Sequence, residues 1–341
     1  MKKLSWFNKL VYFLNLIVAA LLLIACAVPY LTYDFFSFLT FLGLTVPFLA
    51  IANLLFFVYW LVLWRRQMFI SLLVVLLAYF VLGTFIKVDF NGDNDEVGEL
   101  KVMSYNVRSF NRLAEDHSIN TKEKITQLIK QEKPDVVCFQ EVGFNMQPEF
   151  LNYPYSYLKK ILEGNKIHLG LFSKYPIVNA ETINFENSIN NGSYADILFK
   201  GDTVRIYNVH MQSLGVTPGS GNIRSKPVED IYDRVNHKFK RQMNQAKLIQ
   251  QHKLNSPYPT LLSGDFNNTQ FSSTYQLLRG EMKDTFIEKG KGLGRTYDFL
   301  FVPFRIDFIF ADDHFEILSH KNYDDKFSDH FPVMASFRLK H

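Results

Sequence analysis

The sequence predicts an α/β domain that follows an apolar, membrane-spanning region. Residues 1–90 contain three long runs without charge, separated by short polar stretches, and such runs are typical of transmembrane helices. Between residues 100 and 140, a strand-like run, an amphipathic helical run and a second strand-like run follow one another. This order indicates a crossover unit, which is a building block of α/β folds.

The three apolar runs predict spans at about 10–30, 35–64 and 68–86. A buried soluble helix is the alternative for any one run, but three within residues 1–90 favour a membrane region. Three lysines precede the first run, and Arg65 and Arg66 lie in the second loop. Because positively charged loops stay in the cytoplasm, we expect a multi-pass protein of the plasma (inner) membrane. Its N-terminus would be cytoplasmic, and the domain after the third span would be extracytoplasmic, or periplasmic.

A lipoprotein signal is a rival interpretation of the first run. Leu23-Ile24-Ala25-Cys26 follows a short basic start, so cleavage and acylation at Cys26 would also leave the later domain outside. Hydrophobicity that continues past Cys26 favours a span instead. With Cys138 as the only other cysteine, a disulfide framework is excluded.

Charge divides the chain at the same place as hydropathy. The chain has 37 basic and 33 acidic residues, of which residues 1–90 hold six and two. Residues 91–341 therefore hold 31 of each and have no formal net charge. A domain without net charge lacks the usual footprint of tight nucleic-acid binding. We expect residues 91–99 to be a polar, acidic linker and residues 100–341 to form one domain.

The later domain consists of strand-like runs with two clear helices. The first helix should begin after Asn120, an N-cap with Glu123 in the capping-box position, and end before Pro134. Gly201-Asp202 should join two strands in a hairpin, residues 213–235 should form a long loop, and 239–254 a second helix. The expected strands are 100–107, 135–140, 169–173, 194–200, 203–209, 261–264, 304–311, 315–318 and 333–339.

Polar side chains gather at the ends of these apolar runs. In Gly264-Asp265-Phe266-Asn267, a carboxylate and a carboxamide stand two residues apart, so they would share one side of a continuing strand. That pair suits phosphate-ester hydrolysis, because one group accepts a proton from water and the other binds a charged oxygen. Each polar residue also has a plain structural interpretation as a turn or a cap. The remaining candidates are Asn106, Glu141, His210, Asp307, Asp329 and His330.

Six short motifs around these residues, in order, resemble the endonuclease/exonuclease/phosphatase superfamily from about Leu100 to the C-terminus. They are Ser-Tyr-Asn-Val, Gln-Glu-Val, Asn-Val-His, Gly-Asp-Phe-Asn, Arg-Ile-Asp-Phe-Ile-Phe and Ser-Asp-His-Phe-Pro-Val. The resemblance implies a deoxyribonuclease I-like two-sheet α/β sandwich with its site at one edge.

The resemblance also implies roles for the candidate residues. Mg²⁺ or Mn²⁺ would be held by Glu141, helped by Asn106 and Asp329. The catalytic groups would be Asp265 acting on water, Asn267 holding the phosphate, His330 with Asp307 behind its ring, and His210 at the phosphate or the leaving group. Oxygen ligands suit such hard cations, and a metal with two imidazoles can offset charge on the oxygens in an in-line displacement.

Two departures from the family pattern disfavour an abasic-site repair enzyme. Abasic-site endonucleases usually carry Asp where this chain has Arg108, and Asn where it has His210. We therefore expect a membrane-anchored phosphodiesterase, or a phosphomonoesterase, acting outside the cytoplasm on nucleic acid, a phospholipid headgroup or a small phosphoester. The bilayer is an expected partner, and no obligate protein partner is inferred. The alternative is a binding or signalling protein that keeps the fold without turnover.

Overall fold

The computed structural model describes residues 4–31, 39–83, 86–87, 99–111, 120–143, 152–158, 168–215, 228–299 and 302–340. The chain separates into two compact units. Unit 1 comprises residues 1–85 and 269–276, and unit 2 comprises 86–268 and 277–341. Residues 91–98 of the expected linker at 91–99 lie outside the described residues.

Unit 1 is built from apolar helices. The main ones are α1 (Trp6–Ala27), α3 (Thr40–Val62) and α4 (Met68–Leu82), and the short η1 (Val28–Tyr30) extends α1. Alanines 19, 25, 50 and 78 are buried where the helices pack. Asn15 links all three helices, because its Nδ2 donates to Ser71 Oγ (2.7 Å) and its Oδ1 accepts from Trp60 Nε1 (3.0 Å). Such amide contacts fix the pairing of apolar helices.

The expectation of three spans is met only in part. Within the described residues, Trp6–Tyr30 and Thr40–Val62 are long and apolar enough to cross a membrane, by length and composition. The third helix is not, since α4 has 15 residues rather than the expected 19 or so, or about 22 Å against a hydrocarbon core of about 30 Å. Gly83, at φ +85°, follows its end, and this backbone region is one that glycine readily adopts.

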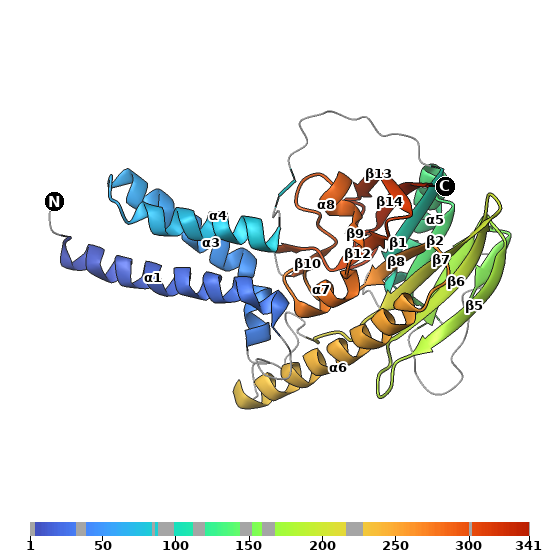
Figure 1. The fold of residues 1–341 in the computed structure, drawn as a ribbon, viewed down its shortest axis with the longest axis horizontal. Helices are drawn as coiled ribbons and strands as arrows, with labels where there is room; N and C mark the ends of the chain where they lie inside the picture. Colours follow the sequence, from blue (N-terminus) through green and yellow to red (C-terminus); the bar gives the residue numbers. More distant parts are fainter. Residues whose placement is uncertain are drawn as a thin grey trace. The chain divides into compact units, whose positions relative to one another are not determined.

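Unit 2 contains two six-stranded sheets (Figure 1). The first has the order β13-β14-β1-β2-β4-β3 and the second β5-β6-β7-β8-β12-β9. The strands of the first are β1 (Leu100–Asn106), β2 (Val136–Val142), β3 (Tyr155–Tyr157), β4 (His168–Ser173), β13 (Phe315–Asn322) and β14 (Val333–Leu339). Those of the second are β5 (Ile177–Asn184), β6 (Asn191–Phe199), β7 (Asp202–His210), β8 (Thr260–Asp265), β9 (Lys283–Asp284) and β12 (Asp307–Ala311).

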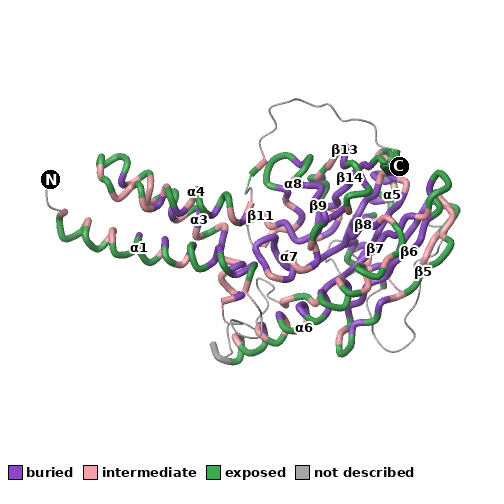
Figure 2. The backbone as a smooth tube through the Cα atoms, viewed as in Figure 1, coloured by how far each residue is buried: buried purple, intermediate pink, exposed green. Residues whose placement is uncertain are grey.

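One apolar core lies between the two sheets, which confirms the expected two-sheet α/β sandwich. Val102 and Val136 of the first sheet share a buried cluster with Ile206, Leu261 and Ile309 of the second. The alternation of a strand explains this, since side chains at every second position face the same side. The central strands are buried along most of their length in Figure 2, whereas β5 is largely exposed.

Helices cover the outer faces of both sheets. α5 (Thr121–Glu132) packs Ile125 and Ile129 against Met103 and Tyr105 of β1, and Asn120 Oδ1 accepts from Glu123 N as the expected N-cap. α6 (Val228–Leu254) contacts the second sheet, and its His252 Nδ1 lies 2.7 Å from the Tyr207 hydroxyl. The sequence predicted this helix from residue 239, but α6 begins at Val228 and so includes residues 228–235 of the expected loop.

Several short elements were not predicted. β5, the helices α7 (Ser273–Arg279) and α8 (Thr285–Lys289), the hairpin of β10 (Tyr297–Phe299) and β11 (Val302–Phe304), and the 3-10 turn η3 (Arg108–Asn111) have weak sequence signals. Their stability comes from tertiary contacts. In α8, for instance, Asp284 caps the helix through Phe286 N (2.9 Å) while its other oxygen pairs with Arg305 (2.6 Å).

A buried amide pair joins the two sheets directly beneath the polar strand ends. Gln140 Nε2 donates to Asn208 Oδ1 (2.7 Å), and Asn208 Nδ2 donates to the carbonyls of Phe139 (3.0 Å) and Gly170 (3.1 Å). Buried polar groups are costly unless paired, so this network selects one alignment of the sheets. It thereby sets the positions of the next residues along each strand.

Candidate active site

Three of the predicted site residues lie at one edge of the first sheet. β1 and β2 run parallel, so Asn106 and Glu141 lie at neighbouring carboxyl ends. β14 runs antiparallel to β1, with Val333 opposite Ser104, so the segment just before β14 reaches the same edge with Asp329. Glu141 is bent out of the strand at φ +55° within an irregular stretch of the β2–β4 pairing.

The second sheet brings its own residues to one edge in the same way. β7 and β8 are parallel with His210 opposite Asp265, and β12 is antiparallel with Asp307 opposite Asp265. The two edges meet through Asn106, whose Nδ2 donates to Asp265 Oδ2 (2.9 Å) and to Glu141 Oε1 (3.2 Å). His210 Nε2 lies 3.5 Å from Asp265 Oδ2 and 3.7 Å from Glu141 Oε1.

Asp265 and Asn267 are brought together by a turn and not by a continuing strand. β8 ends at Asp265, and Asn267 adopts a left-handed backbone at φ +50°. Asn267 donates from its backbone N to Asp265 Oδ1 (2.8 Å) and from Nδ2 to Asp265 Oδ2 (3.2 Å). A glycine is required at position 264, before this turn, for two reasons. Gly264 has φ +144°, and a Cβ on it would lie 1.9 Å from the carbonyl oxygen of Val209. The predicted proximity therefore arises from turn geometry.

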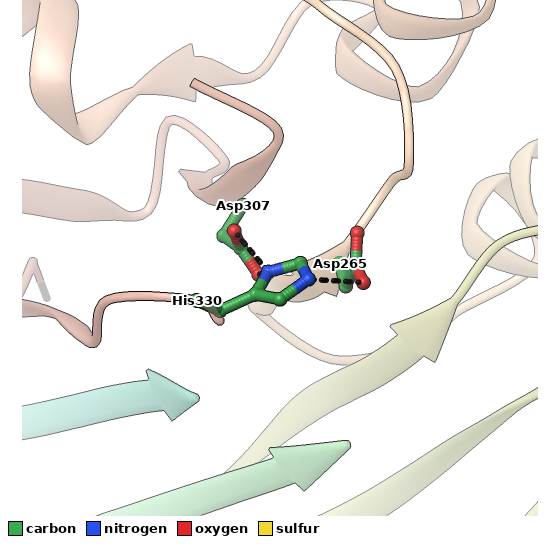
Figure 3. Close-up of side chains that lie close together, drawn as sticks. All are labelled: Asp265, Asp307 and His330. Carbon is green, nitrogen blue, oxygen red and sulfur yellow. Dashed lines mark hydrogen bonds and ion pairs between the residues drawn. The ribbon is translucent and has the colours of Figure 1, made fainter. Parts of the chain in front are cut away.

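His330 lies between two buried carboxylates (Figure 3). Its Nδ1 is 3.0 and 3.2 Å from the two oxygens of Asp307, and its Nε2 is 3.7 Å from Asp265 Oδ2. The Tyr297 ring covers it at 5.1 Å between centroids. An imidazole with an acceptor at each nitrogen is suited to carry two protons and a positive charge.

The charges of this cluster shift the pKa values of its members. Burial alone lowers the pKa of His330, but the carboxylates of Asp307 and Asp265 outweigh it and raise that pKa to about 10. Burial raises the pKa of Asp265 to about 6, against the opposing effect of His330. His210 differs, since burial lowers its pKa, although Asp265 acts in the opposite direction. The site thus places a cationic imidazole and a neutral imidazole on either side of one carboxylate.

His210 has no visible ring partner at its second nitrogen. Its Nδ1 is buried and forms no hydrogen bond with any residue that the structure describes.

Sequence reasoning missed three features of the site. Arg108 Nη1 pairs with Asp329 Oδ2 at 3.2 Å, across the sheet edge. Tyr297 reaches His330 from a hairpin with no strong strand pattern. Gln242 of α6 contacts the backbone of Asn267. The sequence did contain one signal for Gln242. This polar residue lies at helical spacing within the apolar stripe of Phe239, Met243 and Ala246, which indicates that it is buried.

The residues at the first sheet edge fit a hard cation. Glu141 is partly exposed, Asp329 lies at the same edge, and both offer carboxylate oxygens. Asn106 Nδ2 faces Glu141 and Asp265, while its Oδ1 accepts from Arg108 N (3.1 Å). The Asn106 amide must rotate by half a turn before its Oδ1 can bind a cation together with Glu141.

A second cluster of possible ligand atoms consists of Asp265, Asp307 and His330, within 4.8 Å of one another. In that cluster both imidazole nitrogens already face carboxylates. A metal there would compete with the imidazolium, so the edge at Glu141 suits a cation better.

Solved structures with this fold match the chain over most of unit 2. An endonuclease/exonuclease/phosphatase from Beutenbergia cavernae is 18% identical with a TM-score of 0.55, covering 72% of each chain. Mannosyl-6-phosphatase Bt3783 of Bacteroides thetaiotaomicron is 18% identical with a TM-score of 0.53, covering 70% of this chain and 100% of that one. Humanized D. rerio TDP2 is 17% identical with a TM-score of 0.52, covering 70% and 99%. Identities this low support the fold alone.

Sequence comparison assigns the family. No curated protein matches the chain. Residues 8–85 match a domain of unknown function, and residues 103–330 match the endonuclease/exonuclease/phosphatase family. The latter match spans more than half of the chain and includes all eight predicted site residues. The chain therefore belongs to the endonuclease/exonuclease/phosphatase family.

Proposed function

We propose that this protein is a membrane-anchored, metal-dependent phosphoesterase that hydrolyses phosphodiester or phosphomonoester bonds outside the cytoplasm. Members of its family hydrolyse phosphate esters and depend on metals. One observation carries the proposal for this chain. Asp265, completely buried, lies between the His330–Asp307 pair on one side and Asn106, His210 and Asn267 on the other.

The residues of this site can each perform one part of a phosphoryl transfer. Above a pH of about 6, Asp265 is a carboxylate able to orient water and accept its proton. Asn267 Nδ2 and His330 Nε2 both face Asp265 in this structure and would turn their N–H groups to phosphoryl oxygens when the substrate binds, while Asp307 holds the His330 ring from behind. His210, kept neutral by burial, can contact the phosphate or assist the leaving group.

A cation completes this arrangement. Glu141, Asn106 and Asp329 would hold Mg²⁺ or Mn²⁺, which supplies positive charge to offset the charge that develops on the phosphoryl oxygens. Oxygen donors at a water-accessible strand edge suit these two ions. The proposal therefore predicts activity that disappears when divalent cations are removed.

The proposed substrates include several kinds of phosphate ester. One structural neighbour is a mannosyl-6-phosphatase, and D. rerio TDP2 has been crystallised with a single-stranded DNA product. For this chain, lack of net charge in residues 91–341 favours a compact phosphoester or lipid headgroup over a long nucleic acid.

Membrane anchoring rests on unit 1. Two helices meet the length and composition of spans, and the basic residues flank them as expected for a cytoplasmic N-terminus. An extracytoplasmic domain further requires that the 15-residue α4 also crosses the bilayer, because two crossings alone would return the chain to the cytoplasm. Alkaline phosphatase fused after residue 98 should be active in a bacterial host if the following domain is extracytoplasmic. An inactive fusion that is expressed at full length would contradict this topology.

The test of the enzymatic proposal is a substrate panel with the purified full-length chain. DNA, RNA, phospholipid vesicles, sugar phosphates and a chromogenic phosphodiester would be assayed with EDTA, Mg²⁺ or Mn²⁺. We expect metal-dependent turnover of at least one substrate, and Asp265→Ala as a control should abolish it. Absence of turnover on the whole panel would favour the alternative of a binding or signalling protein.

A further inference from the structure

The turns that follow β7 and β8 are joined by one side chain of α6. Gln242 is fully buried, and its Nε2 donates to the carbonyl of Gln212 (2.6 Å) and to that of Asn267 (3.1 Å). Its Oε1 accepts from Asn268 Nδ2 (2.9 Å). A carboxamide has two N–H donors and one carbonyl, so both donors and the acceptor are used here.

The orientation of the Gln242 carboxamide is determined by its partners. Reversing it would place Oε1 against two carbonyl oxygens and Nε2 against the amide nitrogen of Asn268. Both contacts would be repulsive, so a single orientation satisfies the site. A glutamine at this position is therefore not interchangeable with an apolar residue of the same length, although Phe239, Met243 and Ala246 on the buried side of the helix are apolar.

The turn that Gln242 holds needs external support. Asn267 has φ +50°, a left-handed conformation that residues other than glycine adopt at a cost. Its backbone N–H is bound by Asp265 and its carbonyl by Gln242. The Asn267 side chain in turn donates to Met211 O (3.0 Å), in the turn that follows His210.

The turn after β7 is held from the same helix. Gln245 Oε1 accepts from Gln212 N (2.9 Å), while Gln242 binds Gln212 O. Met211 N donates to Asp265 O (2.9 Å). The turns that follow His210 and Asp265 are thus bonded to each other and to α6, but Gln242 is the member of the glutamine pair that touches both.

We propose that Gln242 is a positioning residue that fixes Asn267, relative to Asp265 and the turn after His210, in the geometry that holds the substrate phosphate. This inference rests on the proposed function. Among the described residues, the hydrogen bonds of the Gln242 side chain go to the backbone of Asn267 and Gln212 and to the side chain of Asn268, so it acts through Asn267. Misplacement of such a group by about 1 Å can lower a rate about 100-fold.

The experiment compares Gln242→Met with Gln245→Met in the full-length chain. Gln245 is also buried, lies three residues along the same helix, and binds Gln212 N without contacting Asn267, so Gln245→Met is the matched control. For Gln242→Met we expect kcat to fall at least about 10-fold with KM within about threefold. Gln245→Met should retain kcat within about threefold.

A double-mutant cycle separates positioning from general damage. In an Asn267→Ala background, Gln242→Met should change kcat by less than about twofold, because the group it positions is gone. An undiminished loss in that background, a wild-type kcat in Gln242→Met, or an equal loss in Gln245→Met would overturn the inference. If Gln242→Met does not fold, Gln242→Asn replaces it, since it keeps an amide that can reach one of the two carbonyls, and an intermediate kcat is expected.

Binding of inorganic phosphate, measured by calorimetry with Mg²⁺ present, distinguishes this inference from the proposed function. Phosphate binding weakened at least about fivefold by Gln242→Met, in a protein without turnover, would overturn the enzymatic proposal and support the positioning role. Turnover by the wild type with unchanged kinetics in Gln242→Met would overturn the positioning role alone. A wild type with neither turnover nor phosphate binding would overturn both.

Discussion

Replacing Asp307 by Asn tests how much the His330 pair contributes. Asp307 is 2% exposed and both its oxygens lie within 3.2 Å of His330 Nδ1. Removing one partner of a buried ion pair costs about 3–5 kcal/mol, because the other charge is left uncompensated. Asp265 remains 3.7 Å from the other ring nitrogen, so the lower limit applies. That figure is a stability cost; if the same free energy is lost from the transition state, about 3 kcal/mol corresponds to about a 150-fold lower kcat.

The assay is the steady-state kcat of the full-length chain on a chromogenic phosphodiester with Mg²⁺. Asp313→Asn is the matched control, since that aspartate is exposed and pairs with Lys283 on the surface; its kcat should stay within about twofold of wild type. Thermal unfolding followed by circular dichroism would establish that Asp307→Asn is folded. A folded Asp307→Asn protein with kcat within about threefold of wild type would refute the assignment of His330 as a charged phosphate-binding group.

Three further predictions concern a metal ligand, a buried network and a buried histidine. Glu141→Gln should raise the Mg²⁺ concentration for half-maximal activity at least about 10-fold, measured by metal titration after EDTA treatment; an unchanged titration would remove Glu141 from the metal site. Asn208→Leu leaves the carbonyls of Phe139 and Gly170 unpaired and should lower the free energy of unfolding by about 2–4 kcal/mol in urea; a loss below about 0.5 kcal/mol would show that the network contributes little. Burial lowers the pKa of His320 to about 4, so the unfolded chain binds its proton more readily between about pH 6.5 and 4, and stability present above that window is lost as pH falls through it. Because of this group, the free energy of unfolding should be about 2 kcal/mol higher at pH 7 than at pH 5. His320→Asn should remove that part of the difference.

Burial is the main cause of the lowered pKa of His320, and its hydrogen bonds agree with a neutral ring. The Thr285 hydroxyl donates to Ile309 O (3.0 Å), so it accepts from His320 Nδ1 (2.7 Å), and the proton of the neutral ring lies on Nδ1. Nε2 is then bare, buried and without a partner among the described residues. A second proton there would place a positive charge in a buried site, which is unfavourable, and this outweighs the opposing effect of the Asn322 side chain.

Much of the sheet architecture could be predicted because strand alternation and turn residues act locally. The predicted hairpin joins β6 to β7, although its two loop residues are Lys200 and Gly201, at φ +52° and +99°, and not Gly201 and Asp202. Asn120 begins α5 for the same local reason. The order of the strands within each sheet depends on contacts between residues far apart in the sequence, and it was not predicted. The two-sheet arrangement itself was expected from the family resemblance and not from periodicity.

Other features could not be predicted because their causes are not local. The Asp265–Asn267 contact was expected from strand alternation, but it depends on the left-handed turn that Gln242 and Asp265 hold. The start of α6 was placed too late because polar residues at 228–238 resemble a loop. α4 was predicted too long because hydropathy continues past Gly83, whereas the backbone at that glycine ends the helix.

The most direct test of the account is the turnover of a phosphodiester by the full-length chain and by Asp265→Ala and His330→Ala, each with Mg²⁺ and with EDTA. We expect metal-dependent turnover by the wild type and a loss of at least about 1,000-fold in either variant, while thermal unfolding shows both to be folded. Turnover at the wild-type rate in a folded Asp265→Ala or His330→Ala protein would contradict the account.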